Sequence, residues 1–180
     1  MRWTPAGGAA ELRSNYPEVA HLLCEILAGR ISSRDLATDP TMIPVLQGIG
    51  GNHALNLLKD PRGKRLRYWP RVWAARALAT IGDPACANSL ACGASDTEWR
   101  VRMQSVRAAG LVADSSTVEK IASSRVSDPH PRVRAAVALS IGRKGTARST
   151  IWLRDLAQDP ELLVRRTAER AITTLQARLR

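Results

Sequence analysis

The sequence predicts an all-α fold in which antiparallel helix pairs stack into an α-solenoid, and three observations support this prediction. One short phrase recurs through the second half of the chain at a nearly constant spacing, which is typical of a repeat architecture. After each copy of the phrase, small and apolar residues return with a helical period. The chain has no Phe, 2 Tyr and 5 Trp. Its core must therefore come from Ala, Leu, Val and Ile, which suits close helix packing better than a β-sandwich.

Composition limits the class of protein. The length of 180 residues corresponds to one domain, and 44% hydrophobic with 24% charged residues is a globular composition. No apolar run approaches the ~18 residues of a membrane span, and no apolar stretch of the signal-peptide kind follows Met1. Cys24, Cys86 and Cys92 cannot all pair with one another. We therefore expect a cytoplasmic protein without membrane insertion.

The recurring phrase has an Asp five positions before a Val-Arg step, and its three copies span Asp96–Arg102, Asp128–Arg134 and Asp159–Arg165. Aligning Gly82-Asp83 with Ala113-Asp114 places Pro70-Arg71 in the same register. The register arginines Arg71, Arg102, Arg134 and Arg165 are then separated by 31, 32 and 31 residues. This spacing predicts four helix pairs, at about 53–82, 83–113, 114–145 and 146–180.

In each unit, the second helix is expected to begin at the Val-Arg step. With the Val position numbered zero, positions 4, 7, 8 and 11 share one helical face, and they hold small or apolar residues except at Lys144. The first helices are expected at 53–59, 86–94, 118–125 and 150–158. A single helix pair cannot bury its apolar face, so the units must stack.

The N-terminal third does not follow this register. We expect a flexible segment over 1–15 and an amphipathic helix over 16–28, which Gly29 ends. Ser32-Ser33 can cap a short helix, and the prolines and glycines between Asp39 and Gly51 indicate a broken helix pair. Residues 16–52 are therefore interpreted as an irregular helical cap.

The Asp…Val-Arg phrase followed by an Ala-rich helix resembles the HEAT-repeat family over residues 51–180. Because the period is shorter than the ~40–47 residues of ordinary HEAT repeats, the chain is most similar to the short HEAT-like repeats first associated with phycobilisome lyases. The resemblance implies that the repeated Asp and Arg residues form a ladder between neighbouring units. The residues of this ladder would be Asp96, Asp128, Asp159, Arg71, Arg102, Arg134 and Arg165.

The resemblance also implies that the second helices line a concave surface. Positions 2 and 6 lie opposite the buried face, and several of them are basic or flexible apolar residues. Such a surface can bind an acidic, partly apolar partner, and it can equally be a solvated face. The candidate residues are Arg76, Met103, Arg107, Arg166 and Arg170.

The first unit carries an insertion, because Asp60 precedes Pro70 by ten positions instead of five. Basic residues alternate there with aromatic residues, as in a loop that binds a nucleic-acid backbone and stacks on bases. The other interpretation is that the rings pack beneath the loop and the charges are solvated. The candidate residues are Lys64, Arg65, Arg67, Tyr68 and Trp69.

The formal net charge is +11, and residues 1–59 are balanced, so the whole excess lies in 60–180. A field of this kind attracts acidic proteins, nucleic acid or anionic surfaces. We expect a non-enzymatic binding module, a scaffold or adaptor that binds an acidic protein partner. Nucleic-acid binding through the same surface is the alternative.

Enzymatic signals are weak. His21 and Cys24 lie one turn apart without a second pair of metal ligands, and no nucleophile or phosphate-loop motif occurs. Alkylpurine DNA glycosylases are similar in being cationic HEAT-like solenoids, but positions 2 and 6 hold no carboxylate here. No pigment site of a lyase is identifiable. We therefore expect no catalytic residue, metal, cofactor or small-molecule substrate.

Overall fold

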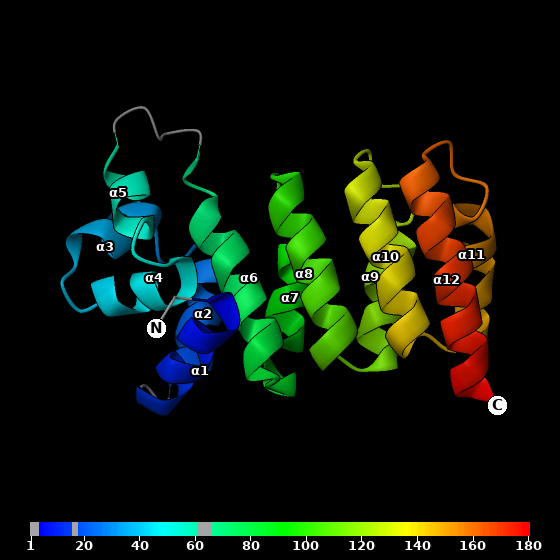
Figure 1. Ribbon diagram of the computed structural model, residues 1–180, viewed down its shortest axis with the longest axis horizontal. Helices are drawn as coiled ribbons and strands as arrows, with labels where there is room; N and C mark the ends of the chain where they lie inside the picture. The colour runs from blue at the N-terminus through cyan, green and yellow to red at the C-terminus, as the bar shows by residue number, and fades with distance from the viewer. Residues whose placement is uncertain (1–3, 16–17, 61–65) are drawn as a thin grey trace.

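The protein is helical throughout the part of the chain that the computed structural model describes, which is residues 4–15, 18–60 and 66–180. No strand occurs in these ranges, and the helices stack along one axis (Figure 1). The all-α solenoid predicted from the sequence is confirmed.

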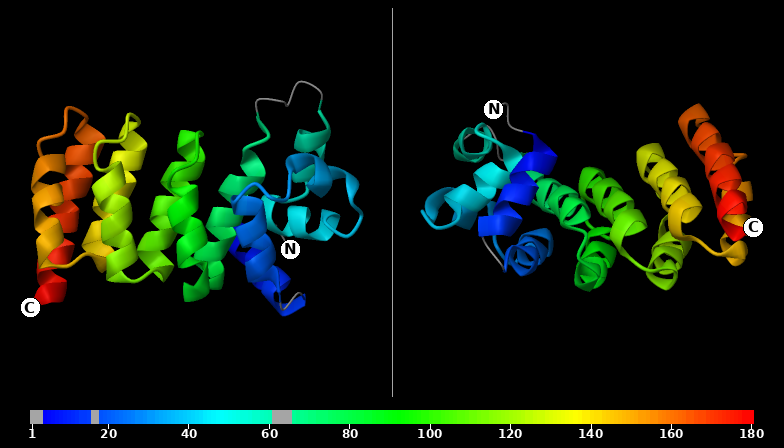
Figure 2. Two further views of the ribbon diagram at one scale, coloured as in Figure 1. Left: turned by 180° about the vertical axis from the view of Figure 1, so that it is seen from behind. Right: turned by 60° about the horizontal axis from the view of Figure 1, so that its bottom comes forward.

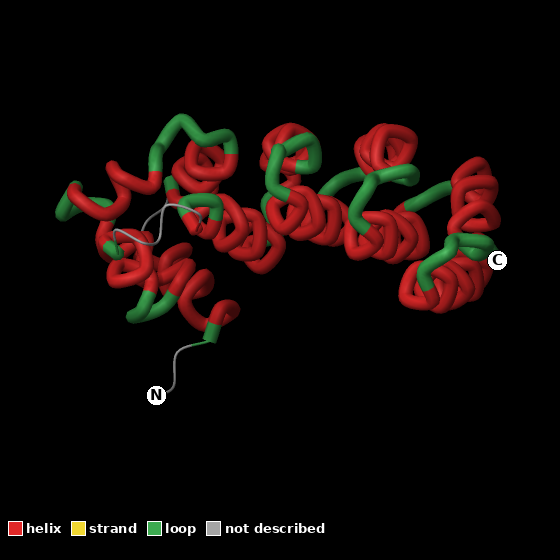
Figure 3. The backbone as a smooth tube through the Cα atoms, turned by 90° about the horizontal axis from the view of Figure 1, so that it is seen from above, coloured by secondary structure: helices red, strands yellow, loops and turns green. Residues whose placement is uncertain are grey.

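Two layers of helices make up residues 69–179. The long helices pack side by side in one layer, which consists of α6 (Trp69–Ile81), α8 (Trp99–Val112), α10 (Pro131–Lys144) and α12 (Leu162–Leu179). The short helices form the other layer, which consists of α7 (Ala87–Gly93), α9 (Ser115–Arg125) and α11 (Thr150–Leu156). Each short helix packs on the long helix that follows it, and Figure 3 shows the layers as two rows.

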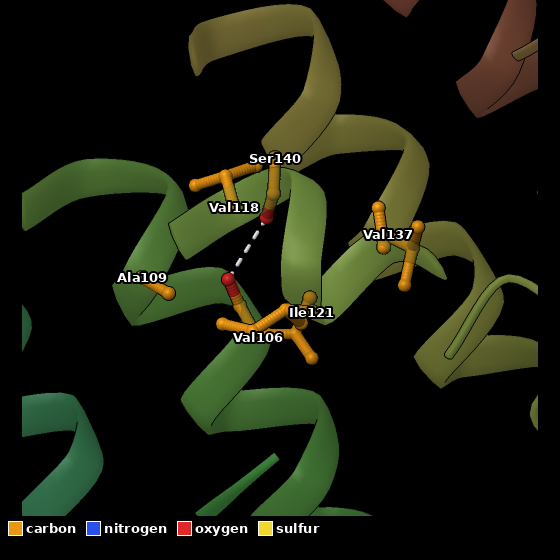
Figure 4. Close-up of a pocket in the computed structure, with 7 residues that line it drawn as sticks. Val106, Ala109, Val118, Ile121, Val137 and Ser140 are labelled. Atoms are coloured by element: carbon orange, nitrogen blue, oxygen red, sulfur yellow. Dashed lines mark hydrogen bonds between the residues drawn. The ribbon is translucent and has the colours of Figure 1, made fainter. Parts of the chain in front are cut away.

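Small residues bring the long helices close together. A Cβ atom added to Gly110 of α8 would lie 2.9 Å from the Cα of Ser140 in α10, and one added to Gly142 would lie 3.0 Å from the Cα of Ala171 in α12. The buried Ser140 Oγ donates a hydrogen bond of 2.8 Å to the carbonyl oxygen of Val106 (Figure 4). The helix backbones can approach this closely because no larger side chain separates them.

The last long helix, α12, differs from α10 on one face. This is the face that, in α10, packs against the long helix that follows. In α12, Glu169 and Thr173 occupy the register positions of Ala138 and Gly142 in α10. Both are exposed, whereas Ala138 and Gly142 are buried. This face of α12 is therefore more polar than the corresponding face of α10.

The helices that precede α6 in the chain gather at the other end of the stack (Figure 2). In chain order they are α1 (Pro5–Asn15), α2 (Val19–Leu27), α3 (Ser33–Thr38), α4 (Ile43–Gly50) and α5 (Ala54–Lys59). The side chain of Ser32 caps α3 by accepting a hydrogen bond from the Asp35 backbone N–H, in a reciprocal capping box.

Residues 1–15 were expected to be flexible, but the described part of this segment forms α1. Ala9 and Leu12 are buried, and Leu12 lies over Gly48 of α4, where a Cβ atom would come within 2.5 Å of it. Arg13 donates a hydrogen bond of 2.9 Å to the carbonyl oxygen of Ile81 at the end of α6. These tertiary contacts hold a segment that has little apolar pattern of its own.

The helix that pairs with α6 also differs from the expectation. Residues 53–59 were expected to form its partner, but α5 packs mainly against α3 and α4. Helix α2 packs on α6 instead, through a buried face that includes Leu23, Ile26 and Leu27, and α2 also contacts α7. It therefore occupies the place of a first helix in the short-helix layer, with α3 to α5 inserted between it and α6.

Candidate interaction surface

Arginine–aspartate pairs join successive long helices. Nε of each arginine lies close to Oδ2 of an aspartate in the loop before the long helix that follows. The distances are 2.7 Å for Arg71–Asp96, 2.7 Å for Arg102–Asp128 and 2.6 Å for Arg134–Asp159. We call these pairs the ladder. The second nitrogen, Nη2, also reaches the other carboxylate oxygen in each pair, so that the contact is bidentate.

Each ladder aspartate also orders its own loop. Oδ1 of Asp128 accepts a hydrogen bond from the backbone N–H of His130 at 2.9 Å, and Oδ1 of Asp159 accepts one from Glu161 at 2.9 Å. The hydrogen bond from Arg134 lowers the pKa of the Asp159 carboxyl below its ordinary value, although burial opposes this. For Asp128, burial raises the pKa, but the hydrogen bonds from Arg102 and the His130 backbone outweigh it.

Arg165 ends the ladder. Its Nη1 donates to the carbonyl oxygens of Asp159 and Pro160 at 2.7 and 2.8 Å, as Nη1 of Arg134 does to those of Asp128 and Pro129. No carboxylate of the described residues pairs with its guanidinium. The same arginine geometry therefore occurs once without an acidic partner.

Aromatic rings cover the start of α6. The rings of Tyr68 and Trp69 stack with their centroids 5.4 Å apart, and Trp69 stacks on Trp73 at 5.9 Å. Trp73 is buried, whereas Tyr68 and Trp69 are half-buried against the core. Arg67 is exposed. Lys64 and Arg65, which were expected to belong to the same binding loop, lie outside the described residues.

A cluster of rings and arginines continues along this edge to α10. The guanidinium of Arg100 lies 5.5 Å from the ring centroid of Tyr68 and 4.4 Å from that of Trp99. Trp99 stacks on His130 with centroids 3.6 Å apart, and Arg132 approaches it at 6.0 Å. Desolvation lowers the pKa of His130 below its ordinary value. The ring of Trp99 is thus already occupied by contacts within the protein, with His130 stacked on it and the guanidinium of Arg100 over it.

The long helices lie on the inside of the curve in Figure 3. Two hollows lie over this layer and share Arg107, and we call the two together the groove. One part of it, the basic section, has a volume of about 410 Å³. Arg76 of α6, Arg107 of α8 and Arg143 of α10 line it, together with Leu111, and no acidic residue does. Three consecutive long helices thus contribute one arginine each to the lining of the same hollow.

Arg76 is held in place without a carboxylate. Its Nη2 donates a hydrogen bond of 3.0 Å to the carbonyl oxygen of Ile49, at the end of α4. Arg76 is half-buried, and this burial lowers the pKa of its guanidinium. A partly desolvated cation that is neutralised by no acidic group of the described chain is a favourable site for an anion.

The groove continues into an apolar section of about 430 Å³ over α8, α10 and α12. Arg107 belongs to both sections, and Arg132 also lines the apolar one. The rest of this lining is mainly apolar and consists of Met103, Ala135, Ala136, Leu139, Leu163 and Thr167. The side chain of Leu163 is 52% exposed, although such a residue would gain by burial.

The family of these helices can now be assigned. Comparison with known families matches residues 93–173 to a model described as HEAT repeats. Residues 93–173 are HEAT repeats. This range includes the ladder pairs Arg102–Asp128 and Arg134–Asp159, and it confirms the family predicted from the sequence. No curated protein matched the chain in a separate comparison.

The groove brings together three of the five residues proposed for the concave surface: Arg76, Arg107 and Met103. Arg166 and Arg170 are exposed on α12 but line neither section. The described chain provides no further long helix to form an opposite wall beside them.

Neither Arg132 nor Arg143 was expected on the concave surface, although Arg132 was expected on the same edge as the basic insertion. They occupy positions −1 and 10 of their helix, and Arg107 occupies position 6. At 100° per residue these positions lie within about 40° of one another. A candidate surface defined by a wider range of helical angles than positions 2 and 6 would therefore have included both arginines.

Other chemistry receives little support from the described part of the chain. No group of three or more His, Cys, Asp or Glu residues could hold a metal there. Burial, with a hydrogen bond to Cys24, raises the pKa of the Cys86 thiol to about 12, which disfavours the nucleophilic thiolate. Among the described helices, none has the length and apolar character needed to cross a membrane.

Proposed function

We propose that this chain is a scaffold or adaptor that binds an acidic protein partner in the groove. HEAT repeats generally mediate protein–protein interactions, and stacked repeats present extended concave surfaces for this purpose. The observation that carries the proposal is the basic section, where Arg76, Arg107 and Arg143 line one hollow and no carboxylate does.

The test uses charge reversal in the groove. The Arg107→Glu/Arg143→Glu variant changes two exposed residues, so each substitution should alter the free energy of unfolding by less than about 0.5 kcal/mol. The matched control is Lys120→Glu/Arg154→Glu, which makes the same charge change on the exposed side of α9 and α11. Thermal melts verify that both variants fold.

Both variants are compared with the unchanged protein in quantitative pull-downs, and captured acidic proteins are then purified for direct binding measurements. We expect the groove variant to weaken this binding at least tenfold and the control variant to retain it. Retention of all partners by a folded groove variant would show that the groove is not the contact surface.

Nucleic-acid binding is the second candidate, and the arginines beside Trp99 favour it. Against it, His130 and Arg100 already contact the Trp99 ring, and no aromatic residue lines either groove section. Titration with random duplex and single-stranded DNA at increasing salt separates the two candidates. Micromolar affinity with a steep salt dependence would favour nucleic acid.

A further inference from the structure

The groove combines two kinds of surface in a fixed order along the stack. Its basic section lies over α6, α8 and α10, and its apolar section lies over α8, α10 and α12. Arg107 is the only lining residue that the two sections share among those described. A ligand that fills both sections must therefore present negative charge at one end and an apolar group at the other.

We propose that the groove binds a peptide segment in which a cluster of acidic residues is followed or preceded by one large apolar residue. This rests on the proposed function and adds to it the chemistry of the ligand. The apolar residue enters the space between Met103, Leu139 and Leu163, and the carboxylates meet Arg76, Arg107 and Arg143.

Two features of the apolar section favour a peptide side chain over a nucleobase. The hollow between Arg107 and Arg132 offers methyl and methylene groups, with the Thr167 hydroxyl as the one neutral polar side-chain group on its lining. It lacks the aromatic platforms on which bases stack. An aliphatic side chain, by contrast, gains by leaving water for such a surface.

The spacing of the helices also limits the motif. Neighbouring packed helices lie about 8–10 Å apart, so the apolar residue and the acidic cluster should be separated by a similar distance. This corresponds to about three residues in an extended peptide, or to about six in a helix.

The probes are synthetic fluorescent peptides with a Glu cluster and one Leu, at both spacings, together with peptides in which Ser replaces the Leu. The net charge is the same in each pair. We expect the better Leu peptide to bind about tenfold more tightly than its Ser counterpart in fluorescence anisotropy. It should also shift the methyl NMR signals of Met103, Leu139 and Leu163.

Variants localise the effect. Leu139→Ser should reduce the Leu-over-Ser preference to less than about threefold, because the groove then offers less apolar surface to the leucine of the peptide. Leu111→Ser, which changes a leucine of the basic section, should leave the preference intact. Arg143→Glu should weaken both peptides equally. If Leu139→Ser impairs folding, the methyl signals of the unchanged protein still show whether the peptide leucine contacts Met103, Leu139 and Leu163.

The outcomes separate the two proposals. Equal binding of Leu and Ser peptides, weakened by Arg143→Glu, would overturn the apolar subsite and leave the acidic partner in place. If neither peptide binds at low salt, both proposals are wrong. Displacement of the peptides by single-stranded DNA at lower concentration would overturn both in favour of nucleic acid.

Discussion

Arg134 binds both carboxylate oxygens of Asp159, with Nε–Oδ2 and Nη2–Oδ1 distances of 2.6 and 2.9 Å. The two residues come from successive long-helix units, so this contact fixes how α12 sits on α10. Arg165 has the same carbonyl contacts but forms no hydrogen-bonded ion pair with a carboxylate of the described chain. Arg134 and Arg165 therefore allow an arginine with an ion-pair partner to be compared with one that has only carbonyl contacts.

We expect Arg134→Ala to lower the free energy of unfolding by about 3 kcal/mol, because it leaves the buried Asp159 without its cation. Arg165→Ala removes only hydrogen bonds to backbone carbonyls and should cost about 1 kcal/mol. Urea denaturation of both variants provides the measurement. Equal decreases would mean that the carboxylate pair contributes nothing beyond the carbonyl contacts.

Acid should destabilise the protein through a small set of carboxyls. Hydrogen bonds from Ser149 and Thr146 lower the pKa of Glu119, and the ladder lowers the pKa values of Asp128 and Asp159. Because these pKa values are lower in the folded than in the unfolded chain, the folded state binds fewer protons. Their contribution is complete at neutral pH and decreases as the pH falls below about 5.

Glu119→Gln tests one of these groups. Oε1 of Glu119 accepts hydrogen bonds from the hydroxyls of Thr146 and Ser149 at 2.5 and 2.6 Å, which joins α9 to the turn before α11. We expect the variant to be less stable at pH 7 and to lose less stability than the unchanged protein on acidification. The exposed Glu169→Gln is the control, and urea midpoints between about pH 7 and about pH 3 are compared. Parallel pH profiles for all three proteins would contradict this prediction.

The repeat register explains how much of the fold could be predicted. The Val-Arg steps are local patterns, and long helices begin within three residues before each of them. The pairing of α2 with α6 could not be read in the same way, because it joins segments about forty residues apart. The helix α1 depends on Gly48, which leaves room for Leu12, and such a contact has no periodic signal.

The site was less predictable than the fold for a related reason. Arg76 and Arg107 follow the repeat register, so their common face could be inferred. Arg143 belongs to the same hollow only because α8 and α10 pack closely enough for their side chains to converge. The partial burial of Arg76 depends on Ile49 in the N-terminal helices, which lie outside the repeat pattern.

Gly110→Ala should destabilise the stack even though alanine favours helices. An added Cβ atom would lie 2.6 Å from Oγ and 2.9 Å from Cα of Ser140, so the backbones of α8 and α10 would have to separate. The higher helix propensity of alanine offsets about 1 kcal/mol of this cost. We therefore expect a net decrease of about 1–3 kcal/mol in the free energy of unfolding. The exposed Gln176→Ala on α12 is the control for propensity alone. An increase in stability for Gly110→Ala would show that α10 can move away at no cost.

Ser105→Ala, which changes another buried position of α8, should have the opposite effect. The Ser105 side chain is fully buried, and its Oγ has no hydrogen-bond partner among the described residues. Removing an unsatisfied buried hydroxyl relieves its desolvation penalty, so we expect the free energy of unfolding to rise by about 1 kcal/mol.

Ser140→Ala is the matched comparison, because the Oγ of Ser140 is also buried but donates a hydrogen bond to the Val106 carbonyl. This variant should lower the free energy of unfolding by about 1 kcal/mol. The two variants are measured together by urea denaturation with a common slope. A decrease in stability for Ser105→Ala as large as that for Ser140→Ala would mean that the Ser105 hydroxyl is hydrogen-bonded in solution, and the packing of α7 against α8 near Gly93 would then have to differ from the structure.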